Sequence, residues 1–259
     1  MKIVIVGATG LIGTRLVDIL RAAGHDVIPA SPSTGVDTIT GRGVAAAFSG
    51  ADVVVDLPNS RSFDDAELMH FFETSTRTVV GAAKDAGVQH HVLLSIVGAD
   101  RMSDIGYMRA KVAQERIVEQ GGVPYTIVRS TQFFEYIPFV IEVAATADTV
   151  PLSPVLMQPV AAADVSDMLA EAATTEPTNG VSEFAGPEAV PLVELGRRVL
   201  HDRHDPRTVI ESPRVGYFYA AVNDESLTPG HDPAVPHRLA PTTYNQWARE
   251  LTASANGKR

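Results

Sequence analysis

The chain has 259 residues, of which 45% are hydrophobic and 20% charged, the balance of a folded globular protein. Its formal net charge of −10 argues against nucleic acid or an anionic membrane as a partner, because both attract basic surfaces. The lack of cysteine excludes disulfides, thiolate catalysis and cysteine-ligated metals. The N-terminus does not have the layout of a signal peptide, and no apolar run reaches membrane-spanning length, so we expect a cytoplasmic protein.

The chain opens on an apolar strand that leads into a glycine-rich turn. Residues 2–6 are mostly branched and apolar, as in a parallel strand that is buried on both faces. Three glycines then allow a tight turn, a close approach to a ligand and close packing of the next helix. The N–H groups and the positive dipole end of that helix predict a pyrophosphate site. A plain strand-to-helix turn is the alternative. The expected cofactor contacts here are Gly7, Thr9, Gly10, Leu11, Ile12 and Gly13.

The end of the second strand, residues 25–30, bears on the choice of cofactor. In NAD-preferring folds of this type a carboxylate at this place binds the ribose 2′-hydroxyl. Residues 30–35 contain no carboxylate. The hydroxyls of Ser31 and Ser33 suit a 2′-phosphate, which favours NADP, with NAD as the alternative cofactor. An ordinary Ser/Pro turn, with hydroxyls bonded to their own backbone, is the other interpretation.

The next segments supply further cofactor contacts. Residues 36–40 suggest a short third strand, on which Asp37 would meet the adenine amino group; a turn or capping role for Asp37 is the alternative. Residues 52–57 predict a buried strand. Strand carboxyl ends line the ligand crevice of such sheets, so Leu57, Pro58 and Asn59 are expected beside the cofactor.

Candidate catalytic residues follow the next strand, residues 90–95. Its adjacent histidines point to opposite faces, so we expect no metal site there. Ser95 ends the strand on the crevice side. Residues 106–118 predict a helix on which Tyr107 and Lys111, four residues apart, share one face. A strand-end serine bonded to backbone and a surface tyrosine beside a solvated lysine are the alternatives.

Two aromatic groups in the C-terminal half suggest an apolar pocket. Gln132, Phe133 and Phe134 follow the sixth strand, which ends near Arg129, and we expect them to bind substrate. Tyr217, Phe218 and Tyr219 form the second group. Ordinary core between a lobe and the sheet is the alternative for both groups. Asp164 precedes an apolar-periodic stretch and predicts a helix N-cap.

These segments together resemble an atypical short-chain dehydrogenase/reductase of the NmrA-like, NAD(P)-binding group. The glycine spacing G-x-x-G-x-x-G fits that superfamily, and the similarity covers most of the chain. It rests on residues 7–13, 52–59, 93–98, 107–111, 124–134, 160–165 and 184–188. We therefore expect an α/β fold with a Rossmann-type, doubly wound parallel sheet. Residues 1–132 would form the dinucleotide-binding core, with a strand near 181–185 returning to the sheet, and residues 133–259 a smaller, mixed substrate lobe.

The resemblance also implies a chemistry, hydride transfer between a nicotinamide and a carbonyl or similar double bond. Tyr107 would be the general acid, Lys111 would lower the pKa of its phenol and bind the nicotinamide ribose, and Ser95 would bond the substrate oxygen. The expected function is NADPH-dependent reduction of a small apolar carbonyl or quinone. A non-catalytic NADP sensor that binds a protein partner, and an epimerase or dehydratase, stay open as alternatives. The oligomeric state is not indicated.

Overall fold

The computed structural model of the protein describes residues 1–60, 62–218 and 220–256, so Tyr219 of the second aromatic group lies outside the described residues. A central sheet of seven strands has the order β11-β8-β5-β4-β3-β1-β2, and all neighbouring strands are parallel. The strands are β1 (Lys2–Val6), β2 (Asp26–Ala30), β3 (Val53–Asp56), β4 (His90–Ile96), β5 (Tyr125–Ser130), β8 (Gly180–Ala185) and β11 (His237–Leu239). The predicted α/β, Rossmann-type fold is confirmed.

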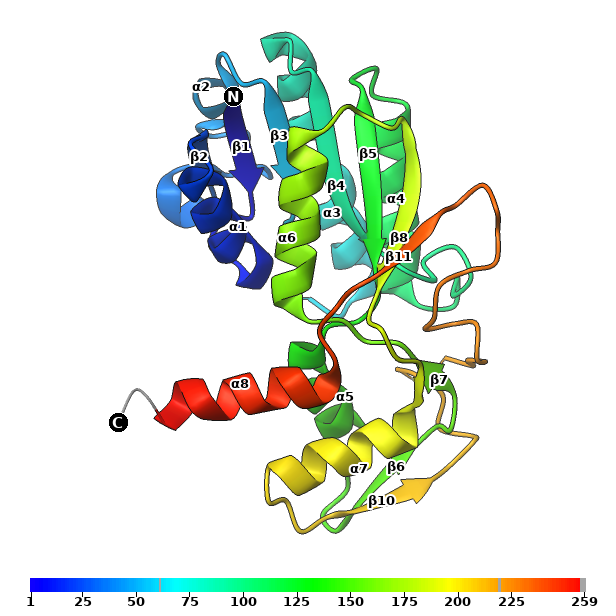
Figure 1. Cartoon of the computed structure of the whole chain (residues 1–259). Coiled ribbons are helices and arrows are strands. Elements are labelled where there is room, and N and C mark those ends of the chain that lie inside the picture. Colours follow the sequence, from blue (N-terminus) through cyan, green and yellow to red (C-terminus); the bar gives the residue numbers. More distant parts are fainter. Residues whose placement is uncertain (61, 219, 257–259) are drawn as a thin grey trace.

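Helices cover both faces of this sheet (Figure 1). One face carries α1 (Leu11–Ala22) and α6 (Ala162–Thr174), and the other carries α2 (Val44–Phe48), α3 (Asp65–Ala86) and α4 (Gly106–Glu119). Successive residues of a strand point to opposite faces. On β1, Ile3 and Ile5 pack toward α1 and α6, whereas Val4 packs toward α2 and α3. Burial on both sides explains why β1 and β3 are almost entirely apolar.

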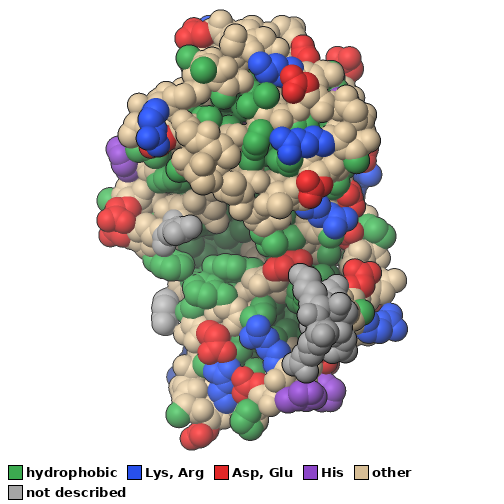
Figure 2. All heavy atoms as spheres, turned by 90° about the vertical axis from the view of Figure 1, so that its left-hand side faces the viewer, with side chains coloured by type: hydrophobic (Ala, Val, Ile, Leu, Met, Phe, Trp, Pro, Cys, Tyr) green, Lys and Arg blue, Asp and Glu red, His purple; other side chains and the backbone are tan. Residues whose placement is uncertain are grey.

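A smaller lobe lies at the carboxyl ends of the strands (Figure 1). It contains η2 (Phe134–Tyr136), α5 (Ile137–Ala144), β6 (Thr149–Leu152), β7 (Leu156–Met157), β9 (Val190–Pro191), α7 (Leu192–Asp202), β10 (Thr208–Glu211) and α8 (Tyr244–Asn256). Strand β10 pairs with β6, and β7 with β9. Residues 162–174 and 237–239, which we had assigned to the lobe, belong to the layers of the sheet. Figure 2 shows a hollow between the two parts, with hydrophobic side chains in it.

Two local predictions were wrong. Residues 36–40 form no strand, because the backbone folds back on itself: Val36 N–H donates to Ser31 C=O at 3.0 Å, and Asp37 N–H to Arg42 C=O at 2.9 Å. Asp164 is not an N-cap, since α6 already begins at Ala162. Its carboxylate instead accepts hydrogen bonds from the Thr242 N–H at 3.1 Å and the Thr242 hydroxyl at 2.9 Å, which ties α6 to the segment before α8.

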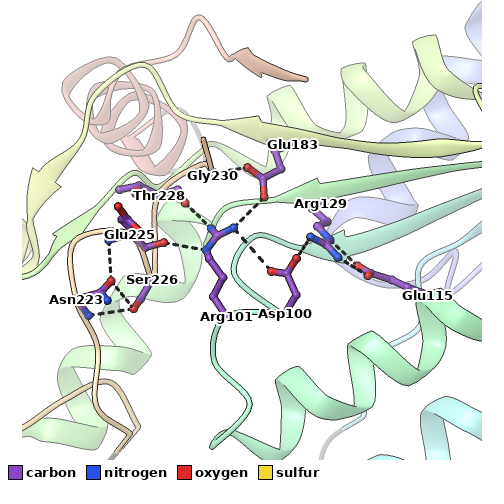
Figure 3. A network of polar contacts seen from close by, with 10 residues as sticks. All are labelled: Asp100, Arg101, Glu115, Arg129, Glu183, Asn223, Glu225, Ser226, Thr228 and Gly230. Carbon is purple, nitrogen blue, oxygen red and sulfur yellow. Dashed lines mark hydrogen bonds and ion pairs between the residues drawn. The ribbon is translucent and has the colours of Figure 1, made fainter. Parts of the chain in front are cut away.

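A network of buried ion pairs fixes α4 against the sheet (Figure 3). The Arg129 guanidinium on β5 donates to both carboxylate oxygens of Glu115 on α4, at 2.9 and 2.7 Å, and to Asp100 at 2.7 Å. Only 9% of the Arg129 side chain and 5% of the Glu115 side chain are exposed. The neighbouring Arg101 lies 3.5 Å from Glu183 and donates to two backbone carbonyls, at 225 and 228. The network therefore holds α4, the loop after β4 and residues 225–230 together.

In the part of the chain that the structure describes, none of the helices combines the length and the hydropathy that a membrane span requires.

We expect Gly13→Ala to destabilise the protein. An added Cβ would lie 2.3 Å from the Gly7 carbonyl oxygen, and overpacking of this kind costs about 1–3 kcal/mol. The matched control is Gly81→Ala in α3, where an added Cβ meets nothing within 4 Å; it should gain about 0.5–1 kcal/mol of helix stability. Urea denaturation of both variants measures the two changes. Equal stabilities would contradict the packing role of Gly13.

Arg129→Ala should cost about 3–5 kcal/mol of unfolding free energy, because it leaves the Glu115 charge buried without its partner. Arg198→Ala is the control: the Arg198 side chain is 34% exposed and pairs along α7 with Glu194, and its loss should cost less than about 1 kcal/mol. The midpoints and slopes of denaturant unfolding give both values. If both variants lost the same small free energy of unfolding, the ion-pair network would not be what fixes α4 against the sheet.

Candidate functional site

The glycine turn lies where the connections of the sheet change direction. Strands β1 and β3 are neighbours, but the chain leaves β1 toward β2 on the other side, and ligands of open α/β sheets bind at such a point. Gly7 has a φ of +82°, and a Cβ there would lie 3.0 Å from the Leu57 carbonyl carbon and from the Pro58 nitrogen. The turn after β1 therefore packs directly on the end of β3. Leu57 and Pro58 lie beside it, and contact of Leu57, Pro58 and Asn59 with the cofactor stays a prediction.

The N-terminus of α1 has the features of an anion site. Its N-cap is Gly10, with an extended backbone and no side-chain cap, and its first turn contains no acidic residue. Leu11 begins the helix with 58% of its surface exposed, which is unusual for a large apolar residue at a helix start that faces a crevice. Backbone N–H groups in this position bind phosphate oxygens. Residues 7–13 thus suit the pyrophosphate of a dinucleotide, because Gly7 and Gly13 let the turn pack closely on the end of β3 and on α1 while the N–H groups at the helix start have no side-chain cap.

The side chains expected near the adenosine of the cofactor form hydrogen bonds with their own neighbours in the chain. The Ser31 side chain is buried, and its hydroxyl lies 3.0 Å from that of Ser33 in a capped turn, η1 (Pro32–Thr34). The Asp37 carboxylate accepts from Ile39 N–H at 2.9 Å, a bond that lowers its pKa. These contacts are the ones expected from the alternative interpretation, in which Ser31 and Asp37 stabilise ordinary turns. Their binding to a cofactor stays a prediction.

Lys111 is directed into the protein. Its side chain is 3% exposed, and Nζ donates to the Leu94 carbonyl at 2.9 Å and to the Gln114 side chain. The ammonium also lies 4.9 Å from the centre of the Phe72 ring. Burial lowers the pKa of Lys111 to about 8, although the charges of Asp56 and Glu115 oppose that change. Lys111 is therefore close to losing its proton in mildly alkaline solution.

Tyr107 shares the Lys111 face of α4, as predicted, and its ring packs edge-on against Phe72, with centroids 5.6 Å apart. Burial raises the pKa of Tyr107 above its ordinary value, and the nearby Tyr136 adds to the rise. The expectation that Lys111 would lower this pKa was wrong for the protein without ligands. The physical reason is that the ammonium bonds to Leu94 and Gln114 instead of facing the phenol.

A buried acid beside Lys111 was missed by sequence reasoning. Asp56 and His91 are both 0% exposed, and the Asp56 Oδ2 lies 3.5 Å from the His91 Nε2. No hydrogen bond within the described residues satisfies either side chain. Burying an unsatisfied charge is costly unless another charge compensates it, and Lys111 supplies one. The sequence did contain a signal for this site. Asp56 interrupts the otherwise apolar residues 53–57, and we assigned this aspartate no role.

Ser95 and Gln132 present free polar groups at the carboxyl ends of β4 and β5. Both are 4% exposed. Within the described chain, the Ser95 hydroxyl and both polar atoms of the Gln132 amide have no hydrogen-bond partner. Leaving such groups unpaired costs about 1–3 kcal/mol each, a cost that a ligand can remove. The structure therefore brings Ser95 and Gln132 to the same edge of the sheet as the glycine turn.

The two phenylalanines after Gln132 differ from each other. Phe133 is half-buried against the core of the sheet, and its backbone bridges to Val160. Phe134 is 3% exposed and packs against Tyr244 and Trp247, with ring centroids 5.7 and 5.4 Å away. Phe134 fits the alternative interpretation as an ordinary core residue, because its ring packs against α8. Contact of either residue with substrate stays a prediction.

Curated relatives match part of the chain. The Photosystem II assembly factor Ycf39 of Cyanophora paradoxa is 25% identical over 149 residues, which cover 52% of this chain and 46% of the relative. The protein of the same name from Synechocystis is 24% identical over the same shares. The chain spans about half the length of these relatives.

Solved structures match the fold over nearly the whole chain. One is dTDP-4-dehydrorhamnose reductase from Bacillus anthracis in complex with NADP, with a TM-score of 0.71, 14% identity and coverage of 97% of this chain and 98% of the other. Another is a short-chain dehydrogenase/reductase superfamily protein from Agrobacterium tumefaciens with bound NAD, with a TM-score of 0.70, 17% identity and full coverage of both chains. Residues 34–176, more than half of the chain, match the NAD(P)H-binding family. The chain therefore belongs to the NAD(P)H-binding family.

Proposed function

We propose that this protein is an NADPH-dependent reductase of a small apolar carbonyl or quinone. One observation carries the proposal. The glycine turn follows β1, and the first turn of α4, which carries Tyr107, comes after β4, so both follow the carboxyl ends of parallel strands. The turn suits a dinucleotide, and the phenol suits a substrate oxygen. When bound, a nicotinamide supplies the hydride for such a reduction.

The cofactor would be held by residues 7–13 at its pyrophosphate and by Leu57, Pro58 and Asn59 beside it. The absence of a carboxylate in residues 30–35 favours NADP over NAD, since the ribose 2′-hydroxyl has no carboxylate to accept its hydrogen bond there. The hydroxyls of Ser31 and Ser33 and the neighbouring backbone are the groups proposed to meet a 2′-phosphate.

Tyr107 is proposed as the proton donor. Its raised pKa keeps the phenol protonated throughout the physiological range. The oxygen of a ketone or aldehyde under reduction becomes an alkoxide, a much stronger base than a phenolate, so the proton transfer is favourable even from this weakly acidic phenol. A quinone gives a hydroquinone anion, whose basicity is similar to that of an ordinary phenolate, so its protonation depends more on the hydrogen bonds that hold the oxygen. The raised pKa also means that little phenolate is present to act as a base near neutral pH.

The unpaired groups of Ser95 and Gln132 are proposed to orient the substrate oxygen by hydrogen bonds. Lys111 would stabilise negative charge on that oxygen and on the phenolate through its ammonium, which exists below a pKa of about 8. The inward direction of Lys111 in the protein without ligands means that binding would have to draw it from Leu94 to reach the nicotinamide ribose.

A non-catalytic NADP-binding protein with a protein partner is the second candidate. Two observations favour it. The curated relatives are named as assembly factors, and Lys111 already has protein partners for its ammonium.

Replacing Tyr107 by Phe tests the proposal. The change should lower NADPH-dependent turnover of a responsive carbonyl or quinone by about two to four orders of magnitude, since the proton donor is lost. NADPH affinity should change less than twofold, because the phenol contacts no part of the glycine turn. Turnover is followed by NADPH absorbance on a panel of both substrate types, and affinity by titration with NADPH and NADH.

Each result separates the two candidates. Unaltered turnover in Tyr107→Phe would remove the acid role. Tight NADPH binding without oxidation on any member of the panel, together with a partner retained by the purified protein, would replace the reductase by the sensor.

The rate of reduction should also depend on the charge of Lys111. The folded-state pKa of Lys111 lies at about 8, below its ordinary value, so the ammonium is present below pH 8 and is lost above it. We expect kcat/KM to be constant between pH 6 and about 7.5 and to fall with a one-proton slope above about 8. The groups that face Lys111 are Asp56 with His91, and Glu115. In Lys111→Met the residual activity should show no inflection near pH 8, and an unchanged profile would exclude Lys111 as its origin.

A further inference from the structure

Four aromatic rings gather at the surface of the crevice, which we call the aromatic cluster: Phe63, Tyr136, Phe139 and Phe218. The exposed fraction is 73% for Phe63, 38% for Tyr136 and 37% for Phe139. Single exposed apolar residues are common on protein surfaces, whereas contiguous exposed apolar patches mark binding sites. The rings form such a patch, because each is within stacking distance of another.

The cluster joins the sheet to the lobe. Phe63 comes from the loop between β3 and α3, which follows the cofactor neighbours Leu57 to Asn59, and the other rings come from the lobe. Phe63 stacks on Phe139 of α5, with centroids 5.8 Å apart and planes 15° apart. Tyr136 and Phe218 complete the lobe side, at 5.1 and 6.2 Å from Phe139. The hollow between the two parts is lined with hydrophobic side chains (Figure 2).

Phe218 is held in place by a strained turn. Its φ is +48°, in a region that bulky residues rarely occupy. The turn is closed by Tyr217 N–H, which donates to Ala220 C=O at 2.9 Å, and Gly216 before it has a φ of +68°. Strain of this kind persists where the surroundings hold it and is found most often at ligand sites.

The inner side of the cluster reaches the proposed proton donor. Tyr107 and Phe218 pack against the same apolar cluster of the lobe, which contains Tyr217, and Tyr136 adds to the effect of burial in raising the pKa of Tyr107. The Gln132 amide lies near the Tyr217 hydroxyl but without the geometry of a hydrogen bond. The apolar rings of the cluster therefore lie at the protein surface, and the polar groups of Tyr107, Tyr217 and Gln132 lie at its buried end. A ligand that fits this arrangement has a flat apolar body and an oxygen at one edge.

We propose that the aromatic cluster binds the planar ring of an aromatic or quinoid substrate between Phe63 and the rings of the lobe. The proposal rests on the reductase function, of which it names the substrate class. The ring carries the oxygen that Tyr107 protonates, and the faces of Phe63 and Phe139 stack on its two sides. Phe63 is the movable side of this sandwich, since 73% of its surface is exposed and little packing resists a shift by one ring thickness.

The test compares 1,4-naphthoquinone, which is planar, with 2-decalone, a saturated bicyclic ketone of similar size. Phe63→Leu and Phe139→Leu keep an apolar side chain but lose the ring. Each should raise KM for 1,4-naphthoquinone by about threefold to tenfold, the range for one aromatic pair, and change KM for 2-decalone and the Kd of NADPH by less than twofold. Ile210→Ala on β10, also an exposed apolar residue, is the control and should alter none of these values. Equal effects on both ketones, or none on 1,4-naphthoquinone, would overturn the proposal.

A binding experiment separates this proposal from the reductase function. The planar, non-reducible 2-naphthol is titrated into the NADPH-loaded protein and followed by its own fluorescence. Binding that weakens in the Phe63→Leu, Phe139→Leu double variant supports the ring site even if no substrate turns over. If 2-naphthol does not bind while carbonyls are reduced, the ring site is wrong and the reductase stands.

Discussion

The close approach of backbone to backbone at the first turn is the constraint on which the rest of the structure depends. A Cβ on Gly13 would lie 2.3 Å from the Gly7 carbonyl oxygen, and one on Gly7 would meet the end of β3. Only because neither position has a side chain does α1 begin directly above the sheet, with its N–H groups uncapped at the point where the strand order reverses. The family to which the chain belongs binds NAD(P)H, and this turn is where the geometry suits the pyrophosphate.

The second organising feature is charge that is buried beside α4. Lys111, Glu115, Arg129 and Asp56 are all less than 9% exposed. Hydrophobic residues in these places would give at least as much stability, because desolvation offsets most of the attraction between buried charges. What the charges supply is position and electrostatics. Glu115 and Arg129 fix the register of α4 on the sheet, and Asp56 with Glu115 opposes the loss of the Lys111 proton. The helix that carries the proposed proton donor is therefore placed by ion pairs as well as by apolar packing.

The lobe adds the apolar half of the site. Its core is separate from that of the sheet and is tied to it by the Arg101 contacts, by Asp164 with Thr242, and by the Phe63–Phe139 stack. Two of these ties are polar, whereas the aromatic one is formed by apolar rings, of which Phe63 is 73% exposed. A ligand can separate the exposed Phe63–Phe139 stack with the smallest loss of free energy among these contacts. This is consistent with a substrate that enters between the sheet and the lobe.

Local sequence patterns determined much of this protein. The apolar strands β1, β3, β4 and β5, the glycine turn and the shared face of Tyr107 and Lys111 were all predicted, because each depends on residues a few positions apart. Tertiary structure decided the rest. The backbone of residues 36–40 bonds to Ser31 and Arg42 instead of to a neighbouring strand. The Asp164 carboxylate bonds to Thr242, 78 positions away. The direction of the Lys111 ammonium, the Asp56–His91 contact and the pairing of Phe63 with Phe139 follow from packing between distant segments, which no local period in the sequence encodes.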